Sequence, residues 1–473
     1  KFFINSTDGF VDQTARAGIQ NLKGGLNTAH ADYNNDGYID IYILRGGWLG
    51  KGGNHPNSLL RNNGNGTFTD VTKAAGLLSF KPTQTAAWGD FNNDGWVDLF
   101  VGAEATKVGG ELLNNPCELW LNKGDGSFEE VASQTGIQVN AFVKGCSWGD
   151  FNNDGWIDLY ISSLNSANFL YVNQPGSGKT GRIFKNIAQA AGVSEPQQSF
   201  PAWFWDFNND GWQDIFVSGY DLRQLNAVGA EAGAEYSKKA TQGERPRLYK
   251  NNGDGTFSDV ATSQGLDRMM YSMGANFGDL DNDGYLDFYV GTGAPDYRSV
   301  VPNRMFRNKA GQGFEEVTMS GFGHIQKGHG VAFGDLDNDG DQDIYAVMGG
   351  AFEGDVAQNV LFENPHQGQD WITLQLVGTD CNRSAIGAKV EVQLSGGRKI
   401  YRTVSTGGSF GASSLQLEIG LGTDATIEQV LVYWPGKFDQ PQAFPGIEKN
   451  RLLQLTQGQS IPKYQNRPRL SWH

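Results

Sequence analysis

The chain has 473 residues, of which 38% are hydrophobic and 12% aromatic, and it carries 65 Gly and a formal net charge of −15. Frequent aromatic residues and glycines favour many short β-strands joined by tight turns over long helices. No apolar run approaches the ~20 residues that cross a bilayer, so a membrane-spanning helix is excluded. We therefore expect an all-β protein. Because the chain opens at Lys1 with no Met and no apolar signal core, we also expect it to be processed and secreted.

The N-terminal segment Phe3–Asp12 (FINSTDGFVD) is a partial copy of a pattern that recurs along the chain. Fuller copies start at Leu60 (LRNNGNGTFTDV), Leu121 (LNKGDGSFEEV) and Tyr249 (YKNNGDGTFSDV), and their Asn-Gly and Asp-Gly pairs predict tight hairpins. We expect the N-terminal copy to supply the outer strands of a blade that the C-terminal end completes. Such an arrangement closes a ring and removes sheet edges.

A nine-residue motif, Asp-x-Asn/Asp-x-Asp-Gly-x-x-Asp, occurs six times, starting at Asp32, Asp90, Asp150, Asp206, Asp279 and Asp335. Its copies start 56 to 60 positions apart, except for one interval of 73, and this spacing suits four-stranded propeller blades. We interpret Leu222–Arg245, inside the long interval, as a weakly helical insertion. With the N-terminal half-copy, the motifs favour a propeller of seven blades. The alternative is a six-bladed ring in which Phe10–Gln13 lies beside Val360–Glu363.

The motif suits Ca²⁺, a hard cation that takes six to eight oxygen ligands. Side chains at positions 1, 3, 5 and 9 and the carbonyl at position 7 converge when the chain curls, and Gly at position 6 takes a backbone conformation that other residues resist. No Glu follows at position 12 and the flanking segments are strand-like, so an EF-hand is not expected. Zinc is disfavoured because the motif contains no Cys or His. Mg²⁺ is the less favoured ion because it prefers strict octahedral sites, and Asx-turns without a metal are the other alternative.

We therefore expect about six structural Ca²⁺ ions, one per loop. The predicted ligands are Asp32, Asn34, Asp36, Tyr38, Asp40, Asp90, Asn92, Asp94, Trp96, Asp98, Asp150, Asn152, Asp154, Trp156, Asp158, Asp206, Asn208, Asp210, Trp212, Asp214, Asp279, Asp281, Asp283, Tyr285, Asp287, Asp335, Asp337, Asp339, Asp341 and Asp343. These loops contain 21 of the 52 acidic residues and no Lys or Arg, so the acidity of the chain is local and itself favours bound cations.

Within one repeat, alternating hydrophobicity predicts four strands, at 85–90, 97–103, 118–122 and 127–131, and the motif loop joins the first two. Tryptophans recur before and within the loops, at Trp88, Trp96, Trp148, Trp156, Trp203, Trp205 and Trp212. We interpret them as core side chains that fill the wedge between blades, in preference to a sugar-stacking surface.

Three cysteines, Cys117, Cys146 and Cys381, are too few to stabilise a fold of this size, and the odd count leaves at least one thiol unpaired or intermolecular. A disulfide between Cys117 and Cys146 and free thiols remain equal alternatives, because sequence spacing does not give a distance.

Beyond the repeats, strands are predicted at 372–377, 389–394, 415–419, 429–433 and 452–455, which make a small β module. The tail, residues 458–473, is extended and basic and carries the apolar residues Tyr464, Leu470 and Trp472. We favour a tail that folds back on its own propeller, and the alternative is docking on a neighbouring subunit, which produces self-assembly.

The segment Trp88–Gly102 (WGDFNNDGWVDLFVG) resembles the FG-GAP/VCBS repeat, over roughly residues 1–364. Ile386–Val390 (IGAKV), Thr406–Ser409 (TGGS), Ile419–Gly422 (IGLG) and Val432–Gly436 (VYWPG) look like an ASPIC/UnbV domain, and the combination resembles the cartilage acidic protein family. The resemblance implies an extracellular calcium-binding protein with adhesive or matrix-like roles. It divides the chain into a propeller (1–364), an ASPIC/UnbV-like β module (365–457) and the tail (458–473).

No Ser-His-Asp or His-Cys constellation is evident among the six His residues, so we favour a binding, adhesion or assembly protein over an enzyme. His30 occupies the place of Trp88 in the next repeat, which favours packing. Lys144 and His329 share the position where an innermost strand begins. They are the candidates of the rival hypothesis, a carbohydrate-active lyase or hydrolase at the channel mouth. We expect a glycan or protein surface as partner and no nucleic acid, because no basic aromatic patch is present.

Overall fold

The computed structural model describes residues 1–7, 9–221, 223, 228–237, 239, 241–293, 301–350, 354–365, 368–406, 410–412 and 414–470. Strands make up 41% and helices 4% of the structure, which confirms the all-β prediction. Within the described part, the helical elements are α1 (Ala188–Ala191), α2 (Val228–Tyr236) and the 3₁₀ turns Gly50–Gly53 and Ser395–Gly397. Helix α2 falls inside the predicted insertion, whose residues 222, 224–227, 238 and 240 lie outside the described residues.

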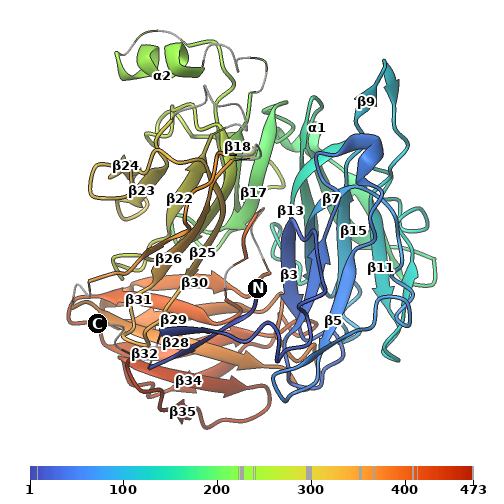
Figure 1. Ribbon diagram of the computed structural model, residues 1–473. Coiled ribbons are helices and arrows are strands. Elements are labelled where there is room, and N and C mark those ends of the chain that lie inside the picture. The colour runs from blue at the N-terminus through green and yellow to red at the C-terminus, as the bar shows by residue number, and fades with distance from the viewer. Residues whose placement is uncertain are drawn as a thin grey trace.

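Six antiparallel sheets follow one another in chain order, each with one motif loop between its first two strands (Figure 1). Five have four strands and the sixth has three. In sequence order they are β3 (Asn27–Ala31), β4 (Asp40–Leu44), β5 (Ser58–Asn62), β6 (Phe68–Asp70); β7 (Thr83–Gly89), β8 (Asp98–Ala103), β11 (Glu118–Asn122), β12 (Phe128–Glu130); β13 (Phe142–Gly149), β14 (Asp158–Leu164), β15 (Phe169–Pro175), β16 (Arg182–Asn186); β17 (Ser199–Trp205), β18 (Asp214–Gly219), β19 (Arg247–Asn251), β20 (Phe257–Asp259); β21 (Ser272–Gly278), β22 (Asp287–Thr292), β23 (Arg304–Asn308), β24 (Phe314–Glu316); and β25 (Gly328–Gly334), β26 (Asp343–Met348), β27 (Val360–Phe362). A small hairpin, β9 (Lys107–Val108) and β10 (Glu111–Leu112), interrupts the second sheet.

The sheets pack face to face, so their inner strands are buried on both sides. Strands β7 and β8 are buried throughout, and the innermost strands β3, β7, β13, β17, β21 and β25 contact one another in that order. Trp88, Trp148, Trp203 and Trp205 are buried in the clusters between sheets, which confirms their prediction as core residues. The tryptophans at position 7 of the loops are half-buried instead. Trp96, for example, lies over the turn glycine Gly124 of its own blade.

The N-terminal copy forms a separate two-stranded sheet, β1 (Phe3–Ser6) and β2 (Gly9–Asp12). Asn5 on β1 donates to the carbonyl of Leu336 in the sixth motif loop, and the N–H of Phe68 in the first blade donates to the carbonyl of Ala17, just beyond β2. The hairpin therefore contacts both the sixth and the first blades. Among the described residues, no pairing joins β2 to β27, as the six-bladed alternative requires. The seven-blade count stays a prediction.

The C-terminal module consists of two four-stranded sheets that lie against the motif loops (Figure 1). One contains β28 (Asp370–Val377), β31 (Leu417–Gly422), β34 (Arg451–Thr456) and β35 (Lys463–Gln465); the other contains β29 (Lys389–Leu394), β30 (Lys399–Thr403), β32 (Ile427–Tyr433) and β33 (Gln442–Pro445). All five predicted strands of this region are present, and β30, β33 and β35 were not predicted.

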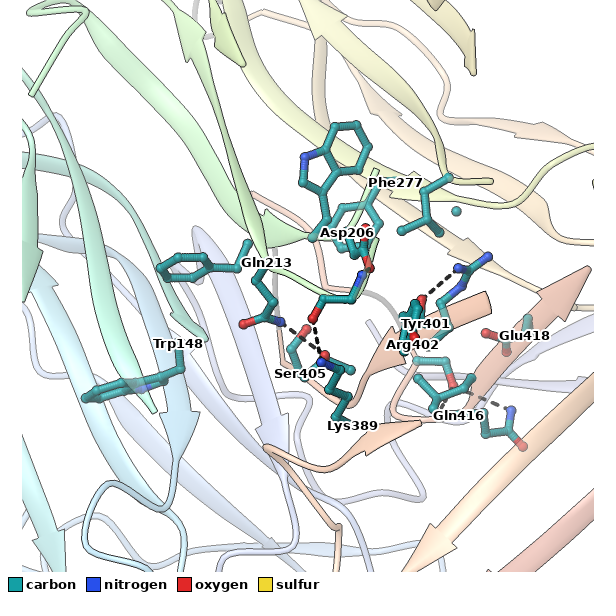
Figure 2. A pocket seen from close by; sticks show the side chains of 18 of the residues that line it. Trp148, Asp206, Gln213, Phe277, Lys389, Tyr401, Arg402, Ser405, Gln416 and Glu418 are labelled. Carbon is teal, nitrogen blue, oxygen red and sulfur yellow. Dashed lines mark hydrogen bonds between the residues drawn. The ribbon is translucent and has the colours of Figure 1, made fainter. Parts of the chain in front are cut away.

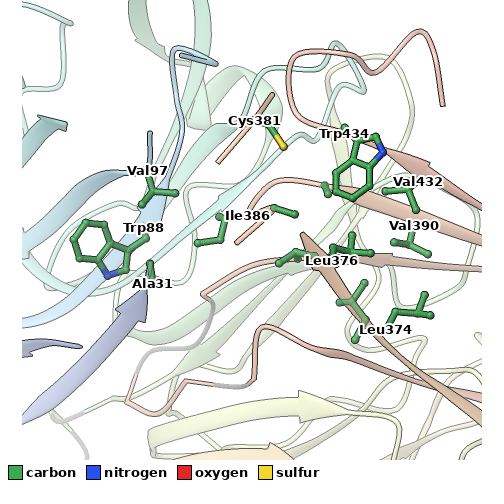
Figure 3. Close-up of a cluster of buried hydrophobic side chains, with 14 of the residues drawn as sticks. Ala31, Trp88, Val97, Leu374, Leu376, Cys381, Ile386, Val390, Val432 and Trp434 are labelled. Carbon is green, nitrogen blue, oxygen red and sulfur yellow. The ribbon is translucent and has the colours of Figure 1, made fainter. Parts of the chain in front are cut away.

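The module and the first two blades share one hydrophobic core. Figure 3 shows Ala31, Trp88 and Val97 from the blades near the module residue Ile386, and all four are buried. At ~25 cal/mol per Å² of buried apolar surface, a continuous core of this kind binds the module firmly to the propeller-like part. The division into residues 1–364, 365–457 and 458–473 stays a prediction.

All three cysteines are buried free thiols, so the Cys117–Cys146 disulfide is not formed. Cys146 lies within 3.3 Å of the Thr85 hydroxyl, and Cys117 accepts the N–H of Ala103 at 3.4 Å. Both residues belong to the core between the second and third blades, where each acts as a small apolar side chain.

Candidate metal centre

The first aspartate of each motif organises its loop into a closed turn. In the second loop, Oδ2 of Asp90 accepts the N–H of Gly95 at 2.9 Å, and Oδ1 accepts the N–H of Asp94 at 3.1 Å. Gly95 has a φ of 90°, where a side chain is disfavoured. The bond from the glycine N–H to the first aspartate recurs in all six loops, at 2.7–3.1 Å. The predicted ligands of each loop are thus placed on one curled backbone.

The aspartate at position 9 ties each loop to the third strand of its blade. Asp98 is fully buried, and its two carboxylate oxygens accept the N–H groups of Asn122 at 2.8 Å and Phe91 at 3.2 Å. The bond to the third strand recurs in all six loops, at 2.7–2.9 Å. Position 9 therefore stabilises the blade in addition to any role as a ligand.

Carboxylates crowd together in these loops. Burial, followed by the charge of Asp94, raises the pKa of Asp90 to about 7. Two triads each bring carboxylate oxygens within 4.8 Å of one another, and these triads could hold a metal ion: Asp279, Asp281 and Asp283, and Asp335, Asp337 and Asp339. The loop donors are all oxygen atoms, which fits a hard cation such as Ca²⁺, and a cation offsets the carboxylate repulsion that adds to burial in raising the pKa values.

The first four loops differ from the last two at position 3, where an asparagine replaces the aspartate. In the second loop, Oδ1 of Asn92 accepts the N–H of Asp94 at 3.3 Å, so an amide oxygen takes the place of a carboxylate oxygen. The fifth and sixth loops, which have the additional aspartate, also form ion pairs with arginines from the C-terminal part. Arg402 contacts Asp279 at 3.1 Å, and Arg469 contacts Asp339 at 2.8 Å. These arginines partly offset the extra negative charge of the fifth and sixth loops.

An asparagine that the sequence analysis did not single out joins each blade to the preceding one. It lies at or near the end of the third strand, and its amide donates to the carbonyl at position 2 of the preceding loop. In the second blade, Asn122 donates to Tyr33 at 2.8 Å and also to Val97 of its own blade at 3.1 Å. Asn173, Asn251, Asn308 and Asn364 repeat the inter-blade bond at 2.6–2.8 Å. The Asn that stands just before an Asp-Gly turn, as at Asn122 and Asn251, was the signal that could have revealed part of this series.

A second asparagine series links the loops directly to one another. The residue at position 4 has a positive φ, and its amide donates to the carbonyl of the position-6 glycine in the next loop. Asn93, for example, donates to Gly155 at 3.0 Å. The other four links, from Asn35, Asn153, Asn209 and Asn282, measure 2.8–3.2 Å. Asn338 in the sixth loop donates to the tail carbonyl of Pro468 at 3.1 Å instead.

The C-terminal module contacts every motif loop. Ser384 accepts the N–H of Asp32 in the first loop at 3.3 Å, and Lys389 donates to Asn153 in the third loop at 2.9 Å. The remaining loops meet the module or tail at Cys381, Tyr401, Arg402, Gly420, Trp371 and Arg469. The loop face of the propeller-like part is therefore the docking surface of the module.

Docking leaves a cavity of about 90 Å³ between the third to fifth blades and strands β29 to β31 (Figure 2). Gln213 donates to the Thr403 hydroxyl at 3.1 Å across it. Trp205 Nε1, Gln213 Oε1 and Arg402 Nε are buried there without a partner in the described part of the chain. A cavity of this size holds several water molecules, and water satisfies mixed donors and acceptors of this kind.

The two candidates of the enzyme hypothesis, Lys144 and His329, have different partners, although both lie near the aromatic pair Phe200 and Phe410. Lys144 has no exposed surface; it pairs with Glu104 at 2.5 Å, and its ammonium lies 3.3 Å from the centroid of the Trp48 ring. Burial lowers the pKa of Lys144 to about 8. His329 lines a separate cavity of about 300 Å³, and His30, predicted as a packing residue, lines one of about 480 Å³.

The tail lies on its own chain. Strand β35 pairs with β34, and the N–H of Leu470 donates to the carbonyl of Asp337 in the sixth loop at 2.7 Å. These contacts are those expected for a tail that folds back on its own chain. Trp472, one of the predicted anchors, lies outside the described residues.

Comparison with known families and proteins gives consistent matches. Residues 32–101, 112–161, 150–217, 206–290 and 291–346 match the FG-GAP-like repeat, and residues 378–462 match ASPIC and UnbV. Cartilage acidic protein 1 of Xenopus tropicalis is 26% identical over 316 residues, which are 64% of this chain and 44% of that protein. The Homo sapiens protein of the same name is 24% identical over 307 residues, which are 62% and 41% of the two chains. This chain thus spans less than half the length of these curated relatives.

Solved structures resemble the chain more distantly. The exotype rhamnogalacturonan lyase YesX has a TM-score of 0.39 and 12% identity, covering 92% of this chain and 73% of that one. The V. cholerae biofilm matrix protein Bap1 has a TM-score of 0.32 and 12% identity, covering 89% and 66%. These similarities carry no argument about function. In the described part of the chain, no helix has the length and apolarity needed to cross a membrane.

Proposed function

We propose that this chain, which belongs to the FG-GAP-like repeat family and carries an ASPIC and UnbV domain, is a secreted calcium-binding protein that acts by binding an extracellular surface. The FG-GAP repeats and the cartilage acidic protein relatives fit an extracellular binding protein. The observation that carries the calcium proposal is the repetition of one curled, all-oxygen loop six times, with two carboxylate triads.

The proposed role of calcium is structural. The loop oxygens at positions 1, 3, 5, 7 and 9 would hold about six ions, one in each loop, and the bound ions would neutralise carboxylates that otherwise repel one another. Because position 9 also bonds the third strand and position 4 bonds the next loop, each ion would stabilise its blade and the neighbouring contact. Binding free energy then becomes folding free energy.

Metal analysis tests this proposal directly. Protein purified with calcium and then dialysed should contain close to six Ca²⁺ per chain by mass spectrometry of the metal. Asp94→Asn should lose about one ion, whereas Asp125→Asn, at an exposed hairpin turn of the same blade, should lose none. A dialysed protein without divalent cations contradicts the proposal, and so does an equal loss in both variants.

The proposed partner is a glycan or protein surface, consistent with a role in adhesion or assembly. Binding to arrays of extracellular glycans and matrix proteins should depend on calcium, because the loops support the whole surface. Turnover of any saccharide in the same panel would contradict a pure binding role and favour a lyase or hydrolase.

A further inference from the structure

The chain of linked loops ends without a seventh motif loop. Beyond the sixth loop, Asn338 donates to the tail carbonyl of Pro468. Asn5 of the N-terminal hairpin donates to the carbonyl of Leu336, at position 2 of the sixth loop. This bond is equivalent to the bond from Asn122 to Tyr33 in the first loop. The hairpin and tail therefore stand where the outer strands and the loop of a seventh blade would lie. Within the described ranges, no further repeat sheet fills the inner part of this position.

A cavity of about 480 Å³ occupies this region, between the first motif loop and the sheet that contains β28 and β34. A second cavity, of about 170 Å³, lies between the sixth loop and the same sheet. Gln416 and Arg467 line both cavities. The larger cavity has the size of a ligand site, and it lies where a motif loop would otherwise stand.

The lining of the larger cavity is cationic. Arg467 makes no hydrogen bond or ion pair in the described part of the chain, and Arg383 reaches Asp32 only at 4.0 Å. Asp32 is the one acidic side chain among the described residues of the lining, and its carboxylate already accepts two backbone N–H groups of its own loop. Guanidinium groups match planar carboxylates with paired hydrogen bonds, so this charge pattern fits a carboxylate.

Amides and hydroxyls make up much of the remaining lining. The carbonyl oxygen of Gln375 accepts from Gln465 at 2.7 Å, which leaves the NH₂ of Gln375 without a protein partner among the described residues. The Oε1 of Gln416 is buried and also lacks a partner there. A buried acceptor requires a donor, which sulfate and acetate do not supply at neutral pH but a sugar hydroxyl does.

We propose that the cavity between the first motif loop and the β28 sheet binds a uronic acid unit of an acidic saccharide. Arg467 and Arg383 hold the carboxylate, and the amides of Gln375 and Gln416 bond the ring hydroxyls. The inference rests on the proposed binding function and names the chemical class of its ligand.

Calorimetric titration of the full chain in calcium tests this inference with galacturonate and glucuronate as probes. Galactose and glucose are the neutral counterparts, and acetate and sulfate are anions without hydroxyls. We expect uronate binding that weakens at high salt. Arg467→Gln and Arg383→Gln should each weaken it at least tenfold, because each loses a charge-assisted contact, whereas Arg16→Gln, an exposed arginine outside the lining, should leave it unchanged.

Calcium content and thermal melting of every sample separate the possible failures. Protein that holds calcium and melts normally but binds no uronate overturns this inference and leaves the proposed function intact. Uronate binding that neither cavity variant changes also overturns it. Acetate or sulfate binding as tight as uronate binding overturns the saccharide assignment, and it shows only a site for simple anions. Protein without calcium contradicts the proposed function instead.

Discussion

Each junction between consecutive blades is made by neighbouring repeats, whereas the junction between the sixth and the first blades is assembled from three distant segments. In the regular junctions, an asparagine such as Asn122 bonds the preceding loop across 89 positions of the chain. At the closing junction, Asn5 bonds Leu336, Asn338 bonds the tail, and the N–H of Val331 donates to Phe410 of the module at 3.1 Å.

The same kind of asparagine-to-carbonyl hydrogen bond therefore closes a longer stretch of chain at the closing junction than at the regular junctions. The closing bonds join residues 331 and 130 positions apart in the sequence, so forming them fixes long stretches of chain. The regular bonds join residues 82 to 101 positions apart, and four of the five are buried. We therefore expect the closing junction to open before the regular ones.

Calcium removal should have the largest effect and should reveal this order. If the free Ca²⁺ concentration is about 100 times the Kd of a loop, binding at that loop adds about 2.7 kcal/mol to the free energy of unfolding. Removal of Ca²⁺ from all loops by a chelator should therefore lower Tm by about 10 °C or more. Hydrogen exchange after chelation should rise first in β1, β2 and residues 410–412. A melting curve indifferent to chelator, or simultaneous exchange in all blades, would contradict the expectation.

The pH dependence of the metal-free protein should be the next largest effect. Burial and neighbouring carboxylates raise the pKa of Asp40, Asp90 and Asp206 to about 7, whereas an unfolded aspartate titrates near 3.9. The folded metal-free protein thus binds more protons between about pH 4 and pH 7, so its free energy of unfolding falls as the pH rises through this window.

Denaturant melts at pH 5 and pH 7.5 check this sign. The metal-free protein should be more stable at pH 5, whereas calcium-loaded protein should be less stable at pH 5, because protons compete with the cation for the carboxylates. Equal stability of the metal-free protein at both pH values would show that the loop carboxylates ionise normally.

Asparagine substitutions compare the two kinds of junction directly. Asn122→Ala leaves the carbonyls of Tyr33 and Val97 unpaired in a buried site, so it should cost about 2–3 kcal/mol. Asn5→Ala removes one bond at a partly exposed site and should cost about 1 kcal/mol. Asn63→Ala, at an exposed hairpin, is the control and should cost less. A larger loss for Asn5→Ala would reverse the proposed order of stability.

Removal of the tail should have the smallest effect. Arg469 is 61% exposed, and ion pairs at such sites contribute about 0–1 kcal/mol. Truncation after Gln465 should therefore shift Tm by only a few degrees and leave the particle mass from light scattering unchanged. A large native particle that falls to monomers on truncation would instead support tail-driven assembly.

The sequence alone determined the all-β class, the repeat, the strands of a blade and the loop that positions each predicted ligand. These features are local: the Asp-Gly turn, the alternation of 118–122 and the tryptophans before the second, third and fourth loops act over a few residues. The sequence also contained both asparagine series, but an asparagine has many possible partners, so its bond to another blade could not be read from the pattern.

Only the tertiary structure decided what depends on long-range docking. In the folded chain, the module lies on all six loops. Arg402 and Arg469 form ion pairs with the acidic fifth and sixth loops, and Lys144 is buried beside Glu104. The tertiary structure also placed Arg383 and Arg467, 84 positions apart in the chain, around one cavity. Packing of the whole chain sets these distances, and no periodicity within a segment encodes them.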